Sequence, residues 1–264
     1  MSLTIATWNV NSVRLRLKGI ERLLATADPD VICLQETKVV NDLFPGDAFR
    51  SLGYEHQAIH GQAGYHGVAV LSRQPIEHVE PIHWCGKDDC RHLQVKLASG
   101  HELHNLYVPA GGDVPDPEAN DKFAHKLDFL RELSAWFDDG AADAGSSVLL
   151  GDLNIAPLET DVWSHKQLLK VVSHTPVEVD ALEKLQASAD WVDAVRRIIP
   201  PSERLYSWWS YRARDWAASD RGRRLDHVWV TPDLASTVET VDVLREARGW
   251  DQPSDHVPVV VSLQ

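Results

Sequence analysis

Short apolar segments alternate with longer amphipathic ones along the whole sequence. Apolar residues recur at helical spacing at 14–24 and 123–137, which predicts two helices. Apolar runs of strand length lie at residues 3–8, 31–35, 67–71, 92–97, 102–108, 147–150, 225–230, 238–244 and 257–263. Ser99-Gly100 joins two of these runs and predicts a hairpin. Many strands with few helices predict an α/β protein with two packed sheets covered by helices.

The chain has no obvious internal boundary. No Gly/Ser-rich or low-complexity stretch divides it, and the 141–147 segment reads as a surface loop that is too short to separate two domains. We therefore expect one catalytic domain that spans residues 1–264. Strands in both halves end in Asn or carboxylate residues, which is consistent with two related halves that meet at one site.

The composition fits an ordinary globular protein, with 44% hydrophobic and 25% charged residues. The first fifteen residues lack the basic and then apolar pattern of a secretory signal, and no apolar run approaches the roughly 18 residues that span a bilayer. Three cysteines, an odd number, favour free thiols in a reducing compartment. We expect a cytoplasmic, monomeric enzyme without a membrane partner.

The formal net charge of −13 points away from nucleic acid, because an acidic surface repels phosphate. The charge is uneven, however. Between residues 203 and 224, six arginines stand against three acidic residues, a local charge of +3, and Arg14, Arg16 and Lys18 form a smaller basic group. Composition alone still favours an enzyme that does not act on DNA, whereas basic segments that face one way would permit DNA binding.

Polar residues at the ends of apolar strands are the most informative positions for chemistry, because a rigid sheet can aim several of them at one point. Such strand ends occur at residues 7–11, 34–38, 105–109, 151–157 and 253–258. One Asp at a strand end is usually structural, but five ends of matching chemistry indicate a shared site. Carboxylates and carboxamides without cysteine form an oxygen-donor set that suits Mg²⁺ or Mn²⁺ better than zinc.

These strand ends carry motifs that resemble the exonuclease III family of abasic-site DNA repair nucleases, within the endonuclease/exonuclease/phosphatase superfamily. The motifs are WNVN at 8–11, LQETK at 34–38, GVAVLS at 67–72, GDLNIAP at 151–157, RLDHV at 224–228 and PSDHVPV at 253–259. The Gly-Asp-x-Asn element alone indicates only the superfamily, whereas the ordered set, from Trp8 to Pro258, is specific. The resemblance implies a four-layered α/β sandwich with two central, mainly antiparallel β-sheets flanked by helices.

The resemblance also implies a set of catalytic residues. Asp152 matches the residue that orients or deprotonates the attacking water, and Asn154 matches a phosphate contact. Asp226 matches the carboxylate that orients His256, and the histidine contacts the phosphate. Tyr107 matches the tyrosine beside the scissile phosphate.

A metal site and a DNA surface follow from the same resemblance. Glu36 matches the principal metal-binding carboxylate. The implied ligands of Mg²⁺, for which Mn²⁺ can substitute, are Asn9, Glu36, Asp152, Asn154, Asp255 and His256. Trp208 and Leu225 match apolar positions against which the family packs an abasic deoxyribose.

The sequence departs from the family pattern in two places. Ser12 stands where the family usually has glycine. Ala110 stands where a Gln or Ser is frequent, which removes one polar side chain beside the phosphate. Neither departure affects the residues assigned to the metal or to the attacking water.

Aromatic and basic residues alternate near residue 210. Because neighbours on a strand face opposite sides, we expect Trp208 to face the site and Trp209 to face the core. We assign Arg212, Arg221 and Arg223 to contacts with the DNA backbone, and a solvated charged surface is the alternative.

Two cysteines and two histidines lie within ten residues of one another, at His83, Cys85, Cys90 and His92. Their spacing matches none of the usual structural zinc patterns, so we favour a surface hairpin over a zinc knuckle. Cys33 lies within a predicted strand and is expected in the core.

The resemblance implies a divalent-metal-dependent DNA phosphodiesterase of base excision repair. Such an enzyme cuts 5′ to abasic sites and removes nucleotides or blocking groups from the 3′ ends of duplex DNA, its expected partner. Two alternatives stay open. One is a related phosphodiesterase or phosphatase that acts on RNA or on inositol or lipid phosphates, and the other is an inactive DNA-binding module.

Overall fold

A computed structural model describes residues 2–142 and 146–264, so the middle of the expected 141–147 loop lies outside the described residues. Six strands form the first sheet, in the order β13-β14-β1-β2-β4-β3. Their bounds are Leu3–Asn9 for β1, Val31–Gln35 for β2, His56–His60 for β3, Val68–Ser72 for β4, Val238–Val243 for β13 and Val259–Leu263 for β14.

The second sheet also has six strands, in the order β5-β6-β7-β8-β12-β9. Their bounds are Ile76–Ile82 for β5, His92–Leu97 for β6, Glu102–Tyr107 for β7, Ser147–Asp152 for β8, Val192–Asp193 for β9 and Asp226–Val230 for β12. Each sheet has one parallel pair at its centre, β1 with β2 or β7 with β8, and its other pairs are antiparallel. This shared pattern supports two related halves.

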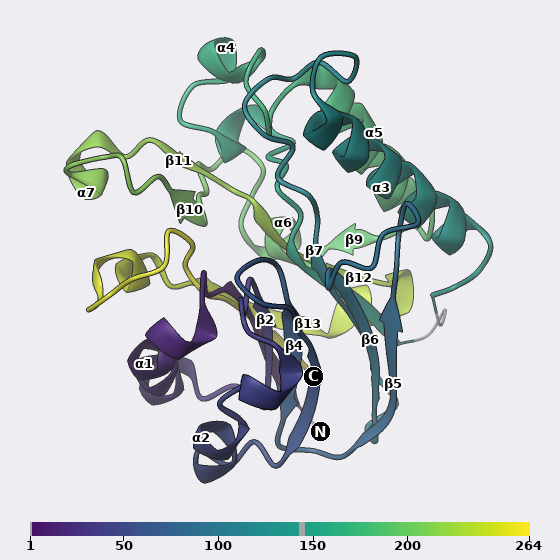
Figure 1. The fold of residues 1–264 in the computed structure, drawn as a ribbon, viewed down its shortest axis with the longest axis vertical. Coiled ribbons are helices and arrows are strands. Elements are labelled where there is room, and N and C mark those ends of the chain that lie inside the picture. Colours follow the sequence, from purple (N-terminus) through teal and green to yellow (C-terminus); the bar gives the residue numbers. More distant parts are fainter. Residues whose placement is uncertain (1, 143–145) are drawn as a thin grey trace.

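Helices cover the outer faces of both sheets (Figure 1). The α-helices are α1 Leu17–Ala27, α2 Gly46–Ser51, α3 Asp121–Asp138, α4 His165–Leu168, α5 Pro176–Ala187, α6 Ala194–Ile198 and α7 Trp216–Ser219. Short 3-10 turns lie at Val13–Leu15, Asn41–Leu43, Glu159–Asp161, Pro232–Thr237 and Arg245–Gly249. A two-stranded ribbon of β10, Trp208–Trp209, and β11, Gly222–Arg223, projects beside the sheets. The expected α/β sandwich of two mainly antiparallel sheets flanked by helices is confirmed.

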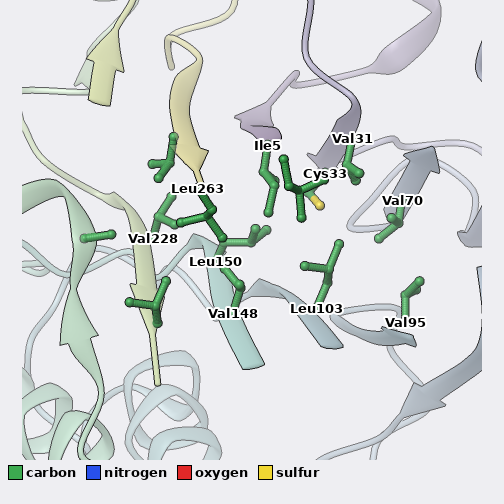
Figure 2. Packing of buried hydrophobic residues seen from close by; sticks show 14 of the residues in the cluster. Ile5, Val31, Cys33, Val70, Val95, Leu103, Val148, Leu150, Val228 and Leu263 are labelled. Atoms are coloured by element: carbon green, nitrogen blue, oxygen red, sulfur yellow. The ribbon is translucent and has the colours of Figure 1, made fainter. Parts of the chain in front are cut away.

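Alternation along the strands separates the core into layers. In β1, Ile5 packs between the sheets, whereas Trp8 packs toward α1. In β8, Leu150 faces the space between the sheets and Leu149 faces α3 and α5. Figure 2 shows this intersheet layer, in which aliphatic side chains from both sheets meet. Cys33 lies in the same layer and is fully buried, as expected.

The structure differs from the predicted elements in a few places. The helix expected at 14–24 begins only at Leu17, because Val13–Leu15 forms a 3-10 turn. The predicted elements did not include the strands β3, β5 and β9 or the helices α2, α4, α5, α6 and α7. Strand β5 is largely exposed and contains Pro81, so it lacks the apolar run that marked the other strands. Among the described residues, no helix combines the length and apolar character needed to cross a membrane.

Candidate functional site

The candidate site lies where the inward-facing rows of the two sheets change from apolar to polar. In β1 the inward row runs through Ile5 and ends at Asn9, and in β8 it runs through Val148 and Leu150 to Asp152. A strand points every second side chain to the same face, so the last residue of each row stays between the sheets. Asn9 and Asp152 therefore meet at one end of the core.

The same rule places two further side chains at this end. In β7 the inward row runs from Leu103 to Tyr107, and in β12 it begins at Asp226 and continues to Val228. The other predicted site residues follow strand ends or precede a strand. They are Glu36 after β2, Asn154 after β8, and Asp255 and His256 before β14.

Unusual backbone conformations aim these loop residues at the site. Glu36 has φ of 51° and Asn154 has φ of 54°, in the left-handed region that residues other than glycine rarely adopt. Gly151 has φ of 130°, and a Cβ there would lie 2.0 Å from the Leu106 carbonyl oxygen on the parallel neighbour β7. The glycine before Asp152 is thus required by the close approach of the two strands. Strain of this kind is concentrated at functional sites.

The Asn9 side chain connects the two sheets. Its Nδ2 donates to Glu36 Oε1 and to Asp152 Oδ2, both at 2.8 Å, and its Oδ1 accepts from the Asn11 backbone N–H. Asn9 is fully buried. The amide thus holds a carboxylate of each sheet in place.

His256 is held between two aspartates. Its Nδ1 lies 2.8 Å from Asp226 Oδ2, and its Nε2 lies 3.6 Å from Asp152 Oδ2. Burial lowers the pKa of His256, but the nearby Asp226 and Asp152 carboxylates outweigh it and raise the pKa above its usual value. An imidazolium carries no free lone pair, so this histidine is suited to donate to a phosphate oxygen.

Two residues that the sequence reasoning did not assign complete the opposite side of the site. Lys38 Nζ lies 2.7 Å from Glu36 Oε2, and it also donates to Asn11 Oδ1. Asn11 Nδ2 donates to Asp255 Oδ1 at 3.1 Å. Both residues belong to the quoted motifs WNVN and LQETK, which was the signal available for them.

A further polar cluster of three residues lies directly below the site. Gln35 Nε2 donates to Asn105 Oδ1 at 2.7 Å and to Thr7 Oγ1 at 2.9 Å, so it joins the two sheets. All three residues are fully buried. A signal for them was available as well, since each is a polar residue within an apolar inward row.

Tyr107 and the acidic cluster influence each other. Burial raises the pKa of Tyr107 well above its usual value, and the Glu36 and Asp152 carboxylates raise it further. The phenol therefore stays protonated and can donate a hydrogen bond. The Arg91 guanidinium covers the Tyr107 ring, with its Cζ 4.9 Å from the ring centroid.

A cavity of about 550 Å³ opens over these residues. It is lined by the predicted residues Glu36, Tyr107, Asp152, Asn154, Trp208, Arg212, Arg221, Arg223, Leu225, Asp255 and His256. Asn9 and Asp226 lie behind this lining, almost completely buried, where they support Glu36 and His256. Trp163, Val171 and Val172 also line the cavity, although the sequence analysis did not select them. The structure thus brings all of the predicted site residues together around one cavity.

The aromatic and basic residues divide between the cavity and the core. Trp208 lines the cavity, whereas Trp209 is buried in the core next to Tyr206, as expected from their alternation. Arg212 and Arg221 are exposed at the rim. The Arg221 guanidinium lies over the Trp163 ring, with Cζ 4.7 Å from its centroid.

One arginine of the basic segment does not contribute a free charge. Arg224 is buried, and its Nε and Nη2 donate to Asp161 at 2.8 and 3.0 Å, while its Nη1 donates to Asp193 at 2.8 Å. Neither aspartate lies within residues 203–224, so the local charge of +3 counted from the sequence overstates the basic surface. Arg224 is instead a structural cation that links three segments.

The His83 to His92 segment is the connection between β5 and β6, and it supports the hairpin. His92 is fully buried, its Nδ1 accepts from Trp84 Nε1, and its Nε2 faces His104 Nδ1 at 3.2 Å. Burial raises the pKa of the Cys85 and Cys90 thiols to about 11, which disfavours the thiolates that zinc binds. In the described part of the chain, the only cluster of three or more potential metal-binding His, Cys, Asp or Glu side chains is Asp152, Asp226 and His256.

Comparisons with known proteins agree with this arrangement. The model of the Endonuclease/Exonuclease/phosphatase family matches residues 6–256. Exodeoxyribonuclease III of Haemophilus influenzae is 28% identical over 96% of this chain and 97% of its own length. The exodeoxyribonuclease of Bacillus subtilis is 30% identical over 97% of each protein.

Solved structures are similar over almost the whole chain. An AP endonuclease from Archaeoglobus fulgidus is 33% identical, with a TM-score of 0.90 and 99% of both chains covered. The 3′ phosphatase NExo from Neisseria, bound to a product DNA hairpin, is 30% identical with the same TM-score and coverage. This chain therefore belongs to the Endonuclease/Exonuclease/phosphatase family, and within it to the exonuclease III group.

Proposed function

We propose that this protein is a DNA repair phosphodiesterase that uses Mg²⁺, or Mn²⁺ in its place, to cut 5′ to abasic sites and to clear 3′ ends in duplex DNA. The observation that carries the proposal is the chain of contacts from Asp226 through His256 to Asp152 at the floor of the cavity. Asn9 connects this chain to Glu36. Relatives named as exodeoxyribonucleases and an AP endonuclease support DNA as the substrate.

The charges at the site fit a divalent cation. Four carboxylates, on Glu36, Asp152, Asp226 and Asp255, lie around two cations, Lys38 and His256. Two negative charges therefore remain, and they would balance the two positive charges of one divalent ion. Glu36 and Asp152, with Asp255 and Asn154 on the same cavity wall, would supply the oxygen ligands that magnesium prefers, and the Asn9 amide nitrogen would orient the first two. A bound divalent ion supplies charge neutralisation on the phosphoryl oxygens.

The protein side chains can perform the other steps of hydrolysis. Asp152 accepts the proton of the attacking water, and burial makes it a stronger base by raising its pKa despite the nearby His256. His256, fixed by Asp226, donates to a phosphoryl oxygen. Tyr107 keeps its proton and can donate to the departing 3′ oxygen.

The working unit is proposed to be a monomer in the cytoplasm. One chain supplies every side chain of the site described above, which supports the monomer. All three cysteines are free, which fits a reducing compartment. Light scattering coupled to size exclusion, with and without a DNA duplex, tests the oligomeric state.

The function is tested with a duplex that carries one tetrahydrofuran abasic analogue. In Mg²⁺ we expect one cut on the 5′ side of the analogue that leaves a 3′-hydroxyl, and we expect no cut in excess chelator. Glu36→Ala should require a much higher Mg²⁺ concentration, because the principal ligand is lost. An uncut duplex alongside rapid hydrolysis of a phosphoinositide, or full activity in chelator, contradicts the proposal.

A further inference from the structure

Arg223 is a cation of the cavity wall without an acidic partner. Its Nη1 donates to the Val172 carbonyl oxygen at 2.9 Å and to Ser173 Oγ at 2.7 Å, and its buried Nε has no hydrogen-bond partner. Across residues 2–142 and 146–264, no carboxylate forms an ion pair with this guanidinium. Its neighbour Arg224, in contrast, pairs with two aspartates.

Arg223 is half-buried in the cavity wall, so its guanidinium has lost part of its water and gained only neutral partners, which is costly for a cation. Burial lowers the pKa of Arg223, in keeping with this cost. The Glu178 carboxylate opposes this lowering of the pKa, but it already pairs with Lys126. The arrangement is therefore suited to an anion that enters the cavity with the substrate.

The position of Arg223 relative to the catalytic residues follows from strand register. Arg223 in β11 is paired with Trp208 in β10, and Trp208 forms a bridge with His256. Neighbouring strands are about 4.8 Å apart, so the Arg223 backbone lies roughly 10 Å from that of His256. Residues that are paired directly across antiparallel strands point to the same face.

The Trp208 ring lies between Arg223 and the acidic cluster. The Arg223 Cζ is 5.2 Å from the ring centroid, and Trp208 Nε1 donates to Asp255 Oδ2 at 3.0 Å. The guanidinium is thus separated from the phosphate position beside His256 by one aromatic ring. The guanidinium can therefore bind the group that follows the scissile phosphate on its downstream side. That group would lie next to the apolar Leu225, which also lines the cavity.

We propose that Arg223 is a specificity-determining residue that binds an anionic group on the downstream side of the scissile phosphate. The proposal rests on the DNA phosphodiesterase function proposed above. Carboxylates and phosphates both match the forked donors of a guanidinium. The anion can therefore be the carboxylate of an oxidised sugar remnant at a 3′ end, or the next backbone phosphate beyond an abasic sugar.

The anion takes part in recognition and not in bond making. In the hydrolysis the water oxygen bonds to phosphorus, and the bond from phosphorus to the upstream 3′ oxygen breaks. The water gives up one proton to Asp152, and the 3′ oxygen gains one proton and leaves as a hydroxyl. The released phosphate carries the anionic group away unchanged.

Two matched pairs of DNA substrates test the proposal and separate the two sources of the anion. The first pair has a 3′-phosphoglycolate end, which carries a charged carboxylate, or a 3′-phosphohydroxyethyl end, in which an uncharged hydroxyl group replaces that carboxylate. The second pair has an internal tetrahydrofuran analogue followed by a phosphate or by an uncharged methylphosphonate. For each pair, kcat/KM is measured with the native protein, Arg223→Met, Arg223→Lys and the control Arg221→Met.

We expect the native protein to prefer the charged member of at least one pair by about tenfold or more, the scale of a hydrogen bond to a charged group. Arg223→Met should lose that preference, and Arg223→Lys should keep part of it. Arg221→Met should slow both members of a pair by the same factor. The pair that shows the preference identifies the source of the anion.

Equal rates for both members of each pair in the native protein overturn the proposal, and this test needs no variant. A uniform loss of rate in Arg223→Met, with native ratios kept, also overturns it, because Arg223 then only supports the Val172–Ser173 loop. If the native protein cuts none of the four substrates, the result has a different meaning. It removes the proposed DNA phosphodiesterase function itself.

Discussion

The acidic residues of the site have been given different properties by their immediate neighbours. Burial raises the pKa of Glu36, but Lys38 and the Asn9 amide outweigh it and hold the pKa below its usual value. For Asp152, burial dominates and raises the pKa. Glu36 is thus the more persistent anion, suited to hold a cation, and Asp152 is the stronger base. When the surroundings of two carboxylates push their pKa values apart in this way, the two groups can take different acid–base roles.

Replacing Asp152 with Asn tests its role as the base. The substitution keeps the size of the side chain but removes its ability to take a proton, so turnover should fall by roughly 10² or more, the scale of general-base catalysis. DNA binding should hold or tighten, because a negative charge beside the phosphate has been removed. Single-turnover cleavage and equilibrium binding to the same duplex measure the two effects. Near-native turnover in this variant would show that another group activates the water.

A double-mutant cycle tests whether Asp226 and His256 act as one unit. Asp226→Asn removes the charge that keeps the histidine protonated and in a fixed orientation, and His256→Asn removes the imidazole itself. Each substitution should lower turnover. The double variant should be little worse than the more damaging single one, because both disable the same donor. Independent, multiplying effects on kcat would contradict the pairing.

At the scale of secondary structure, the site was predictable because it continues the pattern that builds the core. Strand ends with polar residues marked Asn9, Tyr107 and Asp152, and the family resemblance marked Asp226. All four are inward-facing positions of regular strands. Ser12 was noted as a departure from glycine, and its φ of 93° explains why glycine suits this position.

Other parts of the cavity had no comparable signal. Val171 and Val172 come from an irregular connection between α4 and α5, where no apolar period points to a face. The ribbon of β10 and β11 is two residues long on each side, too short for an apolar run to mark its bounds, although the opposite facing of Trp208 and Trp209 was predicted. The neutralisation of Arg224 depends on Asp161 and Asp193, which lie far from it in the sequence. Counting the charges within one segment cannot reveal ion pairs with residues that are distant in the sequence.

The buried Lys126 shows how the helical layer supports the site. Its Nζ donates to Glu178 of α5, to the Asn154 carbonyl oxygen at 2.8 Å and to the Ala110 carbonyl oxygen at 3.3 Å. Both charged side chains of the pair have no exposed surface. One cation therefore joins α3, α5 and two loops that line the cavity.

Lys126→Met should destabilise the protein by about 3–5 kcal/mol, because it leaves the Glu178 carboxylate buried without its partner. Turnover of the folded fraction should also fall, since the loop that carries Asn154 loses its anchor. Lys122→Met on the same helix is the matched control, because Lys122 is exposed and should change stability by no more than about 0.5 kcal/mol. Urea unfolding measures both variants. Equal small losses would mean that the Lys126–Glu178 pair does not hold the two helices together.

For the molecule as a whole, the question is how a chain with net charge −13 binds a polyanion. Arg224 and Arg196 are buried against Asp161, so they take no part in a binding surface. The arginines left at the mouth of the cavity are few, chiefly Arg212 and Arg221. Each exposed cation at this rim should therefore contribute strongly to DNA binding, because the rest of the acidic surface repels DNA.

The salt dependence of binding tests this picture. Arg212→Gln and Arg221→Gln should each weaken binding to duplexes of any sequence. Each lost phosphate contact should also flatten the slope of log affinity against log salt by about one unit, because one fewer counterion is released. Arg131→Gln, on the exposed side of α3, is the control and should leave the slope unchanged, since it lies outside the cavity mouth. Fluorescence anisotropy with a labelled duplex over a range of salt concentrations gives affinity and slope together, with a chelator present so that cleavage does not interfere. If both rim variants keep the native slope, these arginines are solvated surface residues that do not contact phosphates, and the DNA must bind elsewhere on the surface.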